Sequence, residues 1–441
     1  MTTQQHYCSE NRETMSDSER RQLQNTRLDY KSTYYYENAP IIRQLWDDAG
    51  VSPEDIETTD DLREVPLFRK SDARQYMMKT GDPYGGRRCR PMVDLEEDGA
   101  FFFPTSGTTG VPTNLIYSAR DIDVITECQK RVLYQLGLEP GDKFFSWNAQ
   151  FHLSSQGMRK AAEEMGLVHS HADHNLFEVD RFLHVLEYFE PKAVSFVSPP
   201  IVAELKNRFG DDDIDPIELF APVESVVYTG GPLIPDVHQT LEREWGVDIF
   251  EWVGGGEPGW FPAGCSEQKN WGHVADDYFH LEILDLETGE RLGEGERGEL
   301  VITSLGYDGM AHIRWAHDDI AEIERGKCDC GRTTTRVFFY GRVDDLVQVQ
   351  GEDVLPWDVL PIVNGIKEMP SNYFQFYEDS EEALGMRIAL KEDRVAEFDA
   401  FTSKVQTALE DKLAVPVEIQ ETVTESEMGQ EGPGHKIPRV V

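Results

Sequence analysis

The sequence predicts an α/β protein built around a parallel sheet, and two observations support this prediction. Between about residues 100 and 300, short apolar runs typical of strands alternate with longer amphipathic segments typical of helices. The chain has 441 residues, which is enough to bury a large core and to form more than one folding unit. We therefore expect repeated strand–helix–strand units in the middle of the chain, with other elements before and after them.

The elements follow in order along the chain. Residues 1–90 are expected to be helical, because apolar residues recur at helical spacing in 18–28 and 36–49. Phe101–Pro104 holds three aromatic residues in a row and predicts a buried strand that opens the alternating series. The rest of that series is expected as strands at 143–147, 193–197 and 223–228 and helices at 122–136, 156–165, 200–208 and 235–245. A hairpin at 281–291, a strand from Gly298, and then short strands, a charged helix at 394–413 and a polar tail complete the prediction.

The acidic composition excludes several classes of partner. Asp and Glu number 82 against 42 Lys and Arg, which gives a net charge of -40 that is spread along the chain. Binding to nucleic acid or to an anionic membrane needs a basic surface, so we expect neither. We interpret the charge as adaptation to high salt, where ions screen the self-repulsion, with an ordinary acidic protein as the alternative.

The distribution of apolar residues and cysteines predicts a cytoplasmic protein. No apolar run reaches the roughly 18 residues that a membrane span needs, and residues 1–21 are polar rather than a secretory leader. The 6 cysteines are irregularly spaced, so they do not form a disulfide framework.

A loop of small residues after the first strand is suited to binding phosphate. Ser106, Gly107, Thr108, Thr109 and Gly110 combine hydroxyl donors with glycines, which let successive backbone N–H groups turn toward one point. It is not a Walker A loop, because that motif needs a lysine. An ordinary polar turn is the alternative.

Five further segments carry side chains or glycines that a nucleotide site could use. They are Tyr228–Leu233, Trp252–Glu257, Ile313–Ile320, Tyr340–Leu346 and Gly434–Arg439. Each one alone is compatible with an ordinary turn or tail, so only their number and order are informative.

Taken together and in this order, the six motifs resemble those of the phenylacetate–CoA ligases of the adenylate-forming superfamily, with the acidic composition of a haloarchaeal member. The resemblance implies a large N-terminal α/β domain, 1–343, that binds ATP and the acid, and a small mobile α+β domain, 344–441. It also implies a role for each matching position. The residues with implied roles are Ser106, Gly107, Thr108, Thr109 and Gly110 at the phosphates, Gly230 and Gly231 beside adenine, Glu257 at Mg²⁺, Asp319 and Arg342 at the ribose or phosphate, Asp344 at the hinge, Gly351 at coenzyme A and Lys436 in adenylation.

The chain departs from the family pattern at several positions. Val253 replaces the tyrosine that stacks on adenine, so we expect Trp252 to take its place and the triple glycine that follows to enlarge the site. Gln350 and Asp353 replace the arginine and asparagine of the loop near coenzyme A. Trp147–Gln156 matches the segment of the acyl pocket, and its polar side chains suggest an aromatic acid with a hydroxyl or amino substituent, although packing at a strand end is an equal alternative.

Three cysteines and a histidine form a candidate metal site. Cys328 and Cys330 are a close pair, and Cys265 and His273 lie upstream. This Cys₃His set is suited to a structural Zn²⁺ that joins the edge of the Glu257 loop to the segment before the hinge. Because Cys-x-Cys is not the usual zinc spacing, unliganded reduced thiols are the alternative.

The resemblance therefore implies an ATP-dependent acid–CoA ligase that forms an acyl-adenylate and then an acyl-CoA thioester, on an aryl carboxylate such as phenylacetate. The implied cofactors are ATP, Mg²⁺ and coenzyme A, with a structural Zn²⁺, and a homodimer is compatible with it. Two alternatives stay open. One is an adenylyltransferase that acts on a phenolic cofactor, like coenzyme F390 synthetase, and the other is a non-catalytic nucleotide-binding relative.

Overall fold

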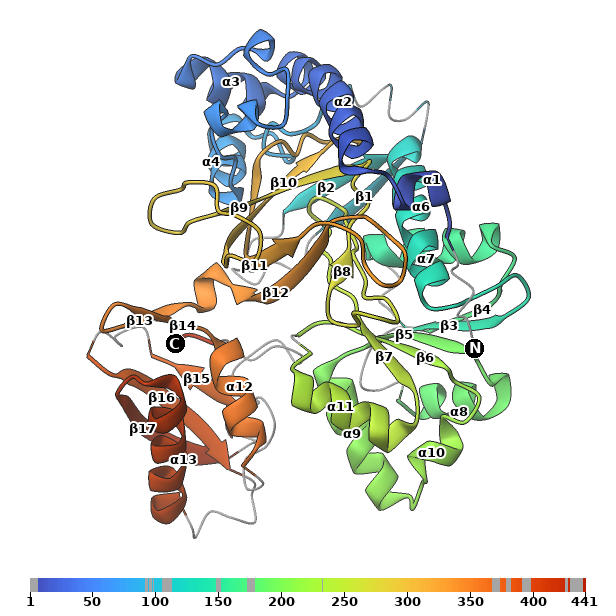
Figure 1. Ribbon diagram of the computed structural model, residues 1–441, viewed down its shortest axis with the longest axis vertical. Coiled ribbons are helices and arrows are strands. Elements are labelled where there is room, and N and C mark those ends of the chain that lie inside the picture. Colours follow the sequence, from blue (N-terminus) through green and yellow to red (C-terminus); the bar gives the residue numbers. More distant parts are fainter. Residues whose placement is uncertain are drawn as a thin grey trace. The chain divides into compact units, whose positions relative to one another are not determined.

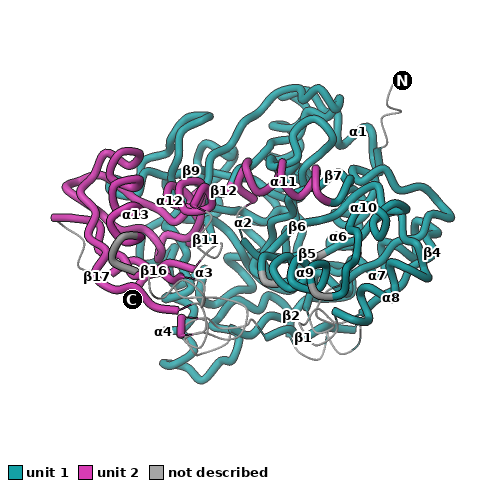
Figure 2. Tube along the Cα trace, turned by 90° about the horizontal axis from the view of Figure 1, so that it is seen from below, with its two compact units in different colours: residues 1–231, 245–317, 321–338 teal, residues 232–244, 318–320, 339–441 magenta. Residues whose placement is uncertain are grey.

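The computed structural model describes residues 7–91, 94, 97, 99–104, 113–147, 152–172, 179–231, 233–366, 373–377, 382–390, 398–424, 427–428 and 439–441. The chain divides into two compact units (Figure 1, Figure 2). The first comprises 1–231, 245–317 and 321–338, and the second comprises 232–244, 318–320 and 339–441. The predicted domain boundary between 343 and 344 stays a prediction. None of the described helices is long and apolar enough to cross a membrane.

The N-terminal part of the first unit is helical, as predicted. It contains α1 (Glu10–Glu13), α2 (Asp17–Asn38), α3 (Pro40–Ala49), two 3₁₀ turns (Pro53–Asp55 and Asp61–Glu64) and α4 (Lys70–Thr80). Ser16 and Glu19 form a capping box at the start of α2, and Pro40 begins α3 where no backbone donor is needed. Gly50, at φ 70°, ends α3 in a left-handed conformation.

The first predicted strand does not join the parallel sheet. β1 (Ala100–Pro104) pairs antiparallel with β2 (Asn114–Ser118) in a two-stranded ribbon. The prediction of a buried aromatic strand is wrong for two of the three rings, because Phe101 is 38% and Phe102 54% exposed, and only Phe103 is buried. Phe103 is the one buried residue of β1, so most of this strand lies at the protein surface.

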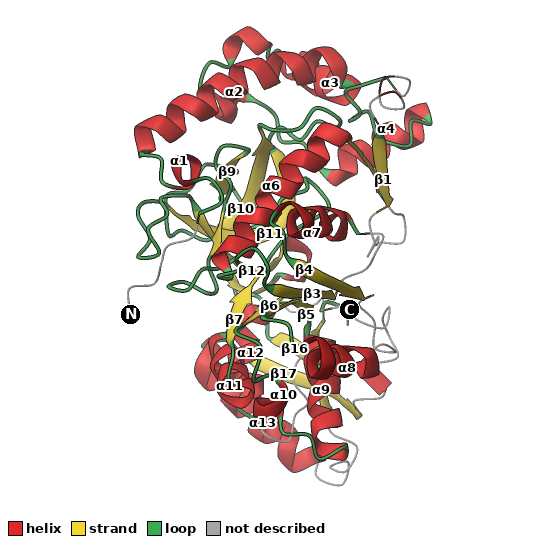
Figure 3. Cartoon of the chain, turned by 90° about the vertical axis from the view of Figure 1, so that its right-hand side faces the viewer, coloured by secondary structure: helices red, strands yellow, loops and turns green. Residues whose placement is uncertain are grey.

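The predicted parallel sheet is confirmed. Its strands are β3 (Lys143–Trp147), β4 (Val168–Ala172), β5 (Ala193–Val197), β6 (Ser225–Tyr228) and β7 (Asp248–Glu251), in the order β4-β3-β5-β6-β7. All four neighbouring pairs are parallel. The helices along this part of the chain are α6 (Ala119–Gln135), α7 (Leu153–Glu164), α8 (Val179–Phe189), α9 (Pro199–Asp211), α10 (Pro216–Leu219) and α11 (Pro235–Trp245). Helices α6 and α7 lie side by side, joined by ion pairs such as Lys130–Glu164 (Figure 3).

A second five-stranded sheet follows, in the order β8-β12-β11-β10-β9. Its strands are β8 (Gly272–His273), β9 (Phe279–Leu284), β10 (Gly298–Ser304), β11 (Trp315–Glu324) and β12 (Arg336–Arg342). The predicted hairpin is present as a turn after β9, where Leu284 bridges to Arg291, but the main antiparallel partner of β9 is β10. The turn therefore connects two strands rather than forming a separate ribbon.

The second unit has its own core. It contains a 3₁₀ turn (Val343–Asp345), β13 (Val347–Val349), β14 (Glu352–Val354), α12 (Pro356–Asn364), β15 (Phe374–Phe376), β16 (Leu384–Leu390), α13 (Phe398–Leu413) and β17 (Val417–Thr424). Strands β15, β16 and β17 form a three-stranded sheet. Apolar side chains of this sheet and of α12 and α13 form one buried cluster, which makes the unit α+β as predicted.

Candidate active site

The Glu257 loop is a tightly packed hairpin at the end of β7. Isolated bridges join Trp252 to Ala263 and Gly255 to Trp260, so the chain folds back on itself. A Cβ atom at Gly254 would lie 2.5 Å from Cδ1 of Phe261, and one at Gly255 would lie 2.8 Å from the Glu257 carbonyl oxygen. These two glycines are therefore required by close packing, and the expectation that the triple glycine enlarges the site is wrong for them.

Trp252 also takes a packing role. Its indole is 4% exposed and stacks on Phe261, with ring centroids 5.2 Å apart and planes at 3°. The ring that we expected to replace the adenine-stacking tyrosine is thus buried within the hairpin.

Two buried tyrosines fix the other side of the loop. The Tyr117 hydroxyl donates to the Gly256 carbonyl at 2.6 Å, and the Tyr307 hydroxyl donates to the Gly259 carbonyl. Burial raises the pKa of both phenols well above the ordinary value, so both remain neutral donors. The position of Glu257 is therefore set by a rigid backbone.

The Glu257 carboxylate is buried against a buried arginine. Arg87 Nη1 donates to Glu257 Oε1 at 2.8 Å, with the Arg87 side chain 0% and the Glu257 side chain 4% exposed. Lys70 Nζ lies 4.0 Å from Glu257 Oε2, and His317 Nε2 donates to the Glu257 carbonyl at 2.8 Å. The sequence prediction named Glu257 but none of its partners.

This arrangement does not fit the Mg²⁺ role that the resemblance implies for Glu257. One carboxylate oxygen already accepts from a guanidinium and the other faces an ammonium group. A divalent cation bound to this carboxylate would lie against two positive charges in a site that excludes water. We therefore derive no catalytic step from Mg²⁺ at Glu257.

Gly230 and Gly231 follow the carboxyl end of β6, the strand next to the edge strand β7 of the parallel sheet. Gly230 has φ 85°, and a Cβ atom at Gly231 would lie 3.0 Å from Pro199 Cγ, so the turn after β6 requires both glycines. Ligands of open parallel sheets bind at this edge. The role of these glycines beside adenine stays a prediction.

Asp319 and Arg342, predicted separately, contact each other in the second unit. Arg342 Nη1 donates to Asp319 Oδ1 at 3.1 Å, and Arg342 Nη2 lies 3.8 Å from Asp318 Oδ2. Asp344 lies in the 3₁₀ turn that follows Arg342 directly. Because Asp319 lies on β11 and Arg342 ends β12, the sheet brings together two motifs that are 23 residues apart.

The predicted coenzyme A loop is a hairpin turn between β13 and β14. Gln350 (φ 54°) and Gly351 (φ 86°) form its two-residue turn, in which both positive φ values match the twist of the strands. Gln350 Nε2 donates to the Glu382 carbonyl at 3.1 Å, and Asp353 Oδ1 accepts from Gln348 at 3.0 Å. The two replaced side chains thus bond within the second unit.

Several predicted positions lie outside the described residues. These are the phosphate loop Ser106, Gly107, Thr108, Thr109 and Gly110, the pocket residues Asn148, Gln150 and Phe151, and Lys436. His152 and Ser154 of the pocket segment are described, and their side chains bond to each other at 2.7 Å where α7 begins.

The four predicted metal ligands come together. The ligand atoms of Cys265, His273, Cys328 and Cys330 all lie within 4.8 Å of one another, and all four residues are buried. A hydrogen bond from the Cys265 thiol, and a second from Cys330, hold the pKa of Cys328 below its usual range, so the cluster favours a thiolate.

Two of the separations fit a tetrahedral zinc ion. Bonds of about 2.3 Å to sulfur and about 2.0 Å to nitrogen set S···S and S···N separations of about 3.8 and 3.5 Å. The Cys265 and Cys328 sulfurs are 3.7 Å apart, and the Cys330 sulfur lies 3.5 Å from His273 Nε2. His273 Nδ1 lies 2.8 Å from Thr334 Oγ1, an acceptor that would fix the ring with Nε2 toward a metal.

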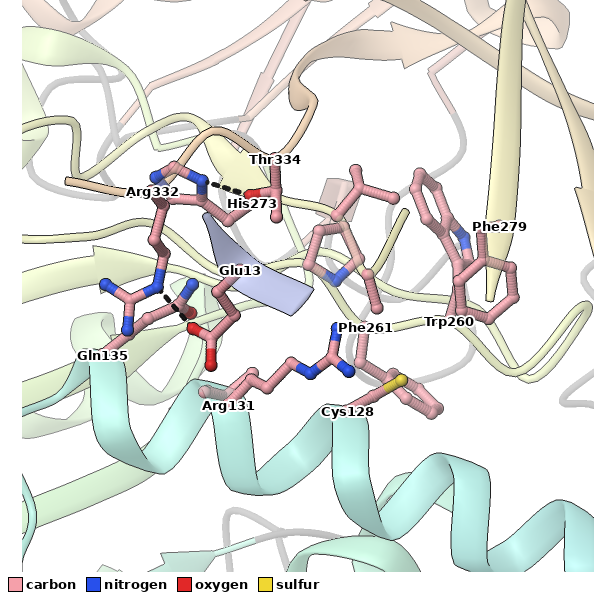
Figure 4. Close-up of a pocket in the computed structure, with 14 residues that line it drawn as sticks. Glu13, Cys128, Arg131, Gln135, Trp260, Phe261, His273, Phe279, Arg332 and Thr334 are labelled. Atoms are coloured by element: carbon pink, nitrogen blue, oxygen red, sulfur yellow. Dashed lines mark hydrogen bonds and ion pairs between the residues drawn. The ribbon is translucent and has the colours of Figure 1, made fainter. Parts of the chain in front are cut away.

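Glu13, at the end of α1, is linked to this cluster through Arg332. Arg332 Nε donates to Glu13 Oε2 at 2.7 Å (Figure 4). Arg332 Nη1 lies 3.9 Å from the Cys330 sulfur. A cavity of about 20 Å³ lies beside these residues and is lined by Glu13, His273, Arg332, Thr334 and neighbouring side chains (Figure 4). A cavity of this size has room for about one water molecule. The burial of all four residues suits the cluster to a structural role.

Sequence reasoning missed Lys70, Arg87 and Thr334. The Thr334 hydroxyl and the Lys70 ammonium carry no local signal. Arg87, in contrast, belongs to a run of three arginines at 87, 88 and 90 in a chain of net charge -40. Such a run could have indicated a buried acidic partner.

Known proteins resemble the chain over most of its length. No family model matches it. The phenylacetate–coenzyme A ligase of Thermus thermophilus is 29% identical over 366 residues, which is 82% of this chain and 79% of that protein. The enzymes of the same name from Pseudomonas putida and Escherichia coli are 27% and 28% identical, over 82% and 78% of this chain and 79% and 76% of their own.

Solved structures of CoA ligases share the fold. A 2-hydroxyisobutyryl-CoA ligase in complex with its acyl-AMP matches with a TM-score of 0.85 and 21% identity, over 100% of this chain and 93% of that one. An anthranilate CoA ligase in complex with anthranoyl-AMP matches with a TM-score of 0.59 and 16% identity, over 76% of this chain and 65% of that one.

Proposed function

Because the chain is a relative of the phenylacetate–CoA ligases and has the fold of adenylate-forming CoA ligases, we propose that it is an ATP-dependent acid–CoA ligase. The observation that carries this proposal is the set of six motifs, which keep the family's order along a chain that is 29% identical to such an enzyme over 82% of its length. The turn at Gly230 in the first unit and the Asp319–Arg342 ion pair in the second unit each support a nucleotide site without defining its ligand.

The proposed reaction has two steps. A carboxylate oxygen attacks the α-phosphorus of ATP and pyrophosphate leaves, which gives an acyl-adenylate. The thiol of coenzyme A then attacks the carbonyl carbon and AMP leaves, which gives the thioester. The first step joins two anions, so a cation must offset both charges, and Lys436 is the residue that we propose for this role.

We further propose an aryl carboxylate such as phenylacetate as the acid. The proposed role of the second unit is to supply Lys436 and then to move about Asp344 for the second step. Zn²⁺ held by Cys265, His273, Cys328 and Cys330 would be structural, because four protein ligands would close its coordination and tie distant segments of the chain together.

A second candidate is an adenylyltransferase that uses no coenzyme A. The observation that favours it is the hairpin at Gln350 and Asp353, whose side chains bond within the second unit instead of matching the family's loop. Such an enzyme would transfer AMP to a phenolic hydroxyl.

One experiment separates these functions. Pyrophosphate release is measured at high KCl over a panel of aryl and aliphatic carboxylates, with and without coenzyme A. Turnover that needs both one class of acid and coenzyme A is the expected result. No turnover with any acid would refute the ligase, and release supported by a phenolic cofactor would favour the adenylyltransferase.

A further inference from the structure

Arg87 is held in one position by every part of its guanidinium group. Nη1 donates to Glu257 Oε1 at 2.8 Å, Nη2 donates to the Asn114 carbonyl at 3.3 Å, and Nε donates to the Tyr84 carbonyl at 3.2 Å. The guanidinium carbon also lies 5.3 Å from the centroid of the Trp315 ring. Because the side chain is completely buried, this cation is a fixed part of the protein.

The Glu257 carboxylate is the counter-ion of this cation. It is 4% exposed, so water does little to stabilise its charge. Lys70 Nζ, 4.0 Å from the second carboxylate oxygen, adds a further positive charge on the side that is more exposed. These two cations together carry one more charge than the carboxylate that they contact.

We propose that Arg87 is a positioning residue that keeps Glu257 as its own counter-ion and prevents this carboxylate from binding a divalent cation in the absence of nucleotide. The inference rests on the proposed function, since only the resemblance assigns Glu257 to a metal.

The test measures binding of Mn²⁺ to zinc-loaded, nucleotide-free protein at high KCl, from the electron paramagnetic resonance signal of free Mn²⁺. The wild-type protein and Glu257→Gln should bind Mn²⁺ equally, because Glu257 provides no Mn²⁺ site in the wild type. Arg87→Met keeps the length of the side chain and removes its charge, so it should gain a site that binds Mn²⁺ about tenfold or more tightly than any such site in the wild type. The double variant Arg87→Met/Glu257→Gln should lose this gain, and Arg88→Met should behave as the wild type.

Two results would overturn the proposal. One is a wild-type Mn²⁺ site that depends on Glu257 without nucleotide, and the other is a folded Arg87→Met variant that gains no site. Removing one member of a buried pair is strongly destabilising, so each variant is first checked by its thermal unfolding curve. If Arg87→Met does not fold, the comparison of wild type with Glu257→Gln still decides the question.

The same experiment is independent of catalysis. Failure of the proposed function would appear as wild-type protein that binds no ATP and releases no pyrophosphate, whereas the Mn²⁺ titration is done without nucleotide. A ligase with a Glu257-dependent Mn²⁺ site before ATP is added would refute the inference alone.

Discussion

Replacing Thr334 by valine should weaken zinc binding without touching a ligand. Thr334 is 4% exposed, and its Oγ1 lies 2.8 Å from His273 Nδ1, on the side of the ring that faces away from the cysteines. Valine has nearly the same shape, so only the hydrogen bond that orients the imidazole is lost. Such outer partners typically contribute 10–100-fold to metal affinity, which corresponds to about 1.4–2.8 kcal/mol.

The assay is competition for Zn²⁺ between purified protein and a chromophoric chelator. Thr126→Val is the matched control, because it also removes a buried threonine hydroxyl. This hydroxyl donates to the Ile122 carbonyl at 2.7 Å within α6, a helix that supplies none of the four candidate ligands. The control should keep the wild-type affinity. Fresh wild-type protein should contain one zinc per chain by elemental analysis.

Two outcomes would refute the reasoning. Protein purified without any bound metal would remove the zinc site altogether. If the protein binds zinc but Thr334→Val retains an affinity within about threefold of wild type, His273 is oriented by something other than Thr334.

The remaining predictions concern catalysis, the C-terminal end and pH. Lys436→Ala should abolish adenylate formation but leave thioester formation from supplied acyl-adenylate largely intact. Lys412→Ala, at an exposed lysine, is the control. Equal loss of both steps would contradict the proposal that the second unit moves between the two steps. Arg439 lies three residues after Lys436, and its guanidinium packs 4.7 Å from the centroid of the Phe374 ring. Arg439→Ala should therefore loosen the segment that carries Lys436 and impair adenylation more than thioester formation. An equal loss of rate in both half-reactions would refute this. Burial lowers the pKa of His169 from 6.5 to about 4. Between these two pH values the unfolded state is protonated at His169 and the folded state is not, so the free energy of unfolding should fall as the pH decreases. Chemical unfolding of His169→Gln should show a smaller fall than wild type, and identical slopes would contradict the assignment.

The sequence predicted best those elements whose local pattern and tertiary environment agree. Lys143–Trp147 and Ala193–Val197 were predicted to the residue, because strands inside a parallel sheet are buried on both faces and form continuous apolar runs. β4 (Val168–Ala172) was missed, since it is the edge strand and contains two histidines and a serine. Phe101–Pro104 was assigned to the wrong sheet, because a short aromatic run cannot indicate which strand it pairs with.

For the candidate site, the order of the residues along the chain was enough to locate the motifs, the three cysteines and the histidine of the candidate metal site, and Glu257. The groups that each of these side chains faces became known from the fold. Arg87 meets Glu257 across 170 residues of chain, and Cys265 meets Cys328 across 63. The physical reason is that motifs are read from neighbouring residues, whereas the charge available to a ligand depends on partners that only folding brings within a few ångströms.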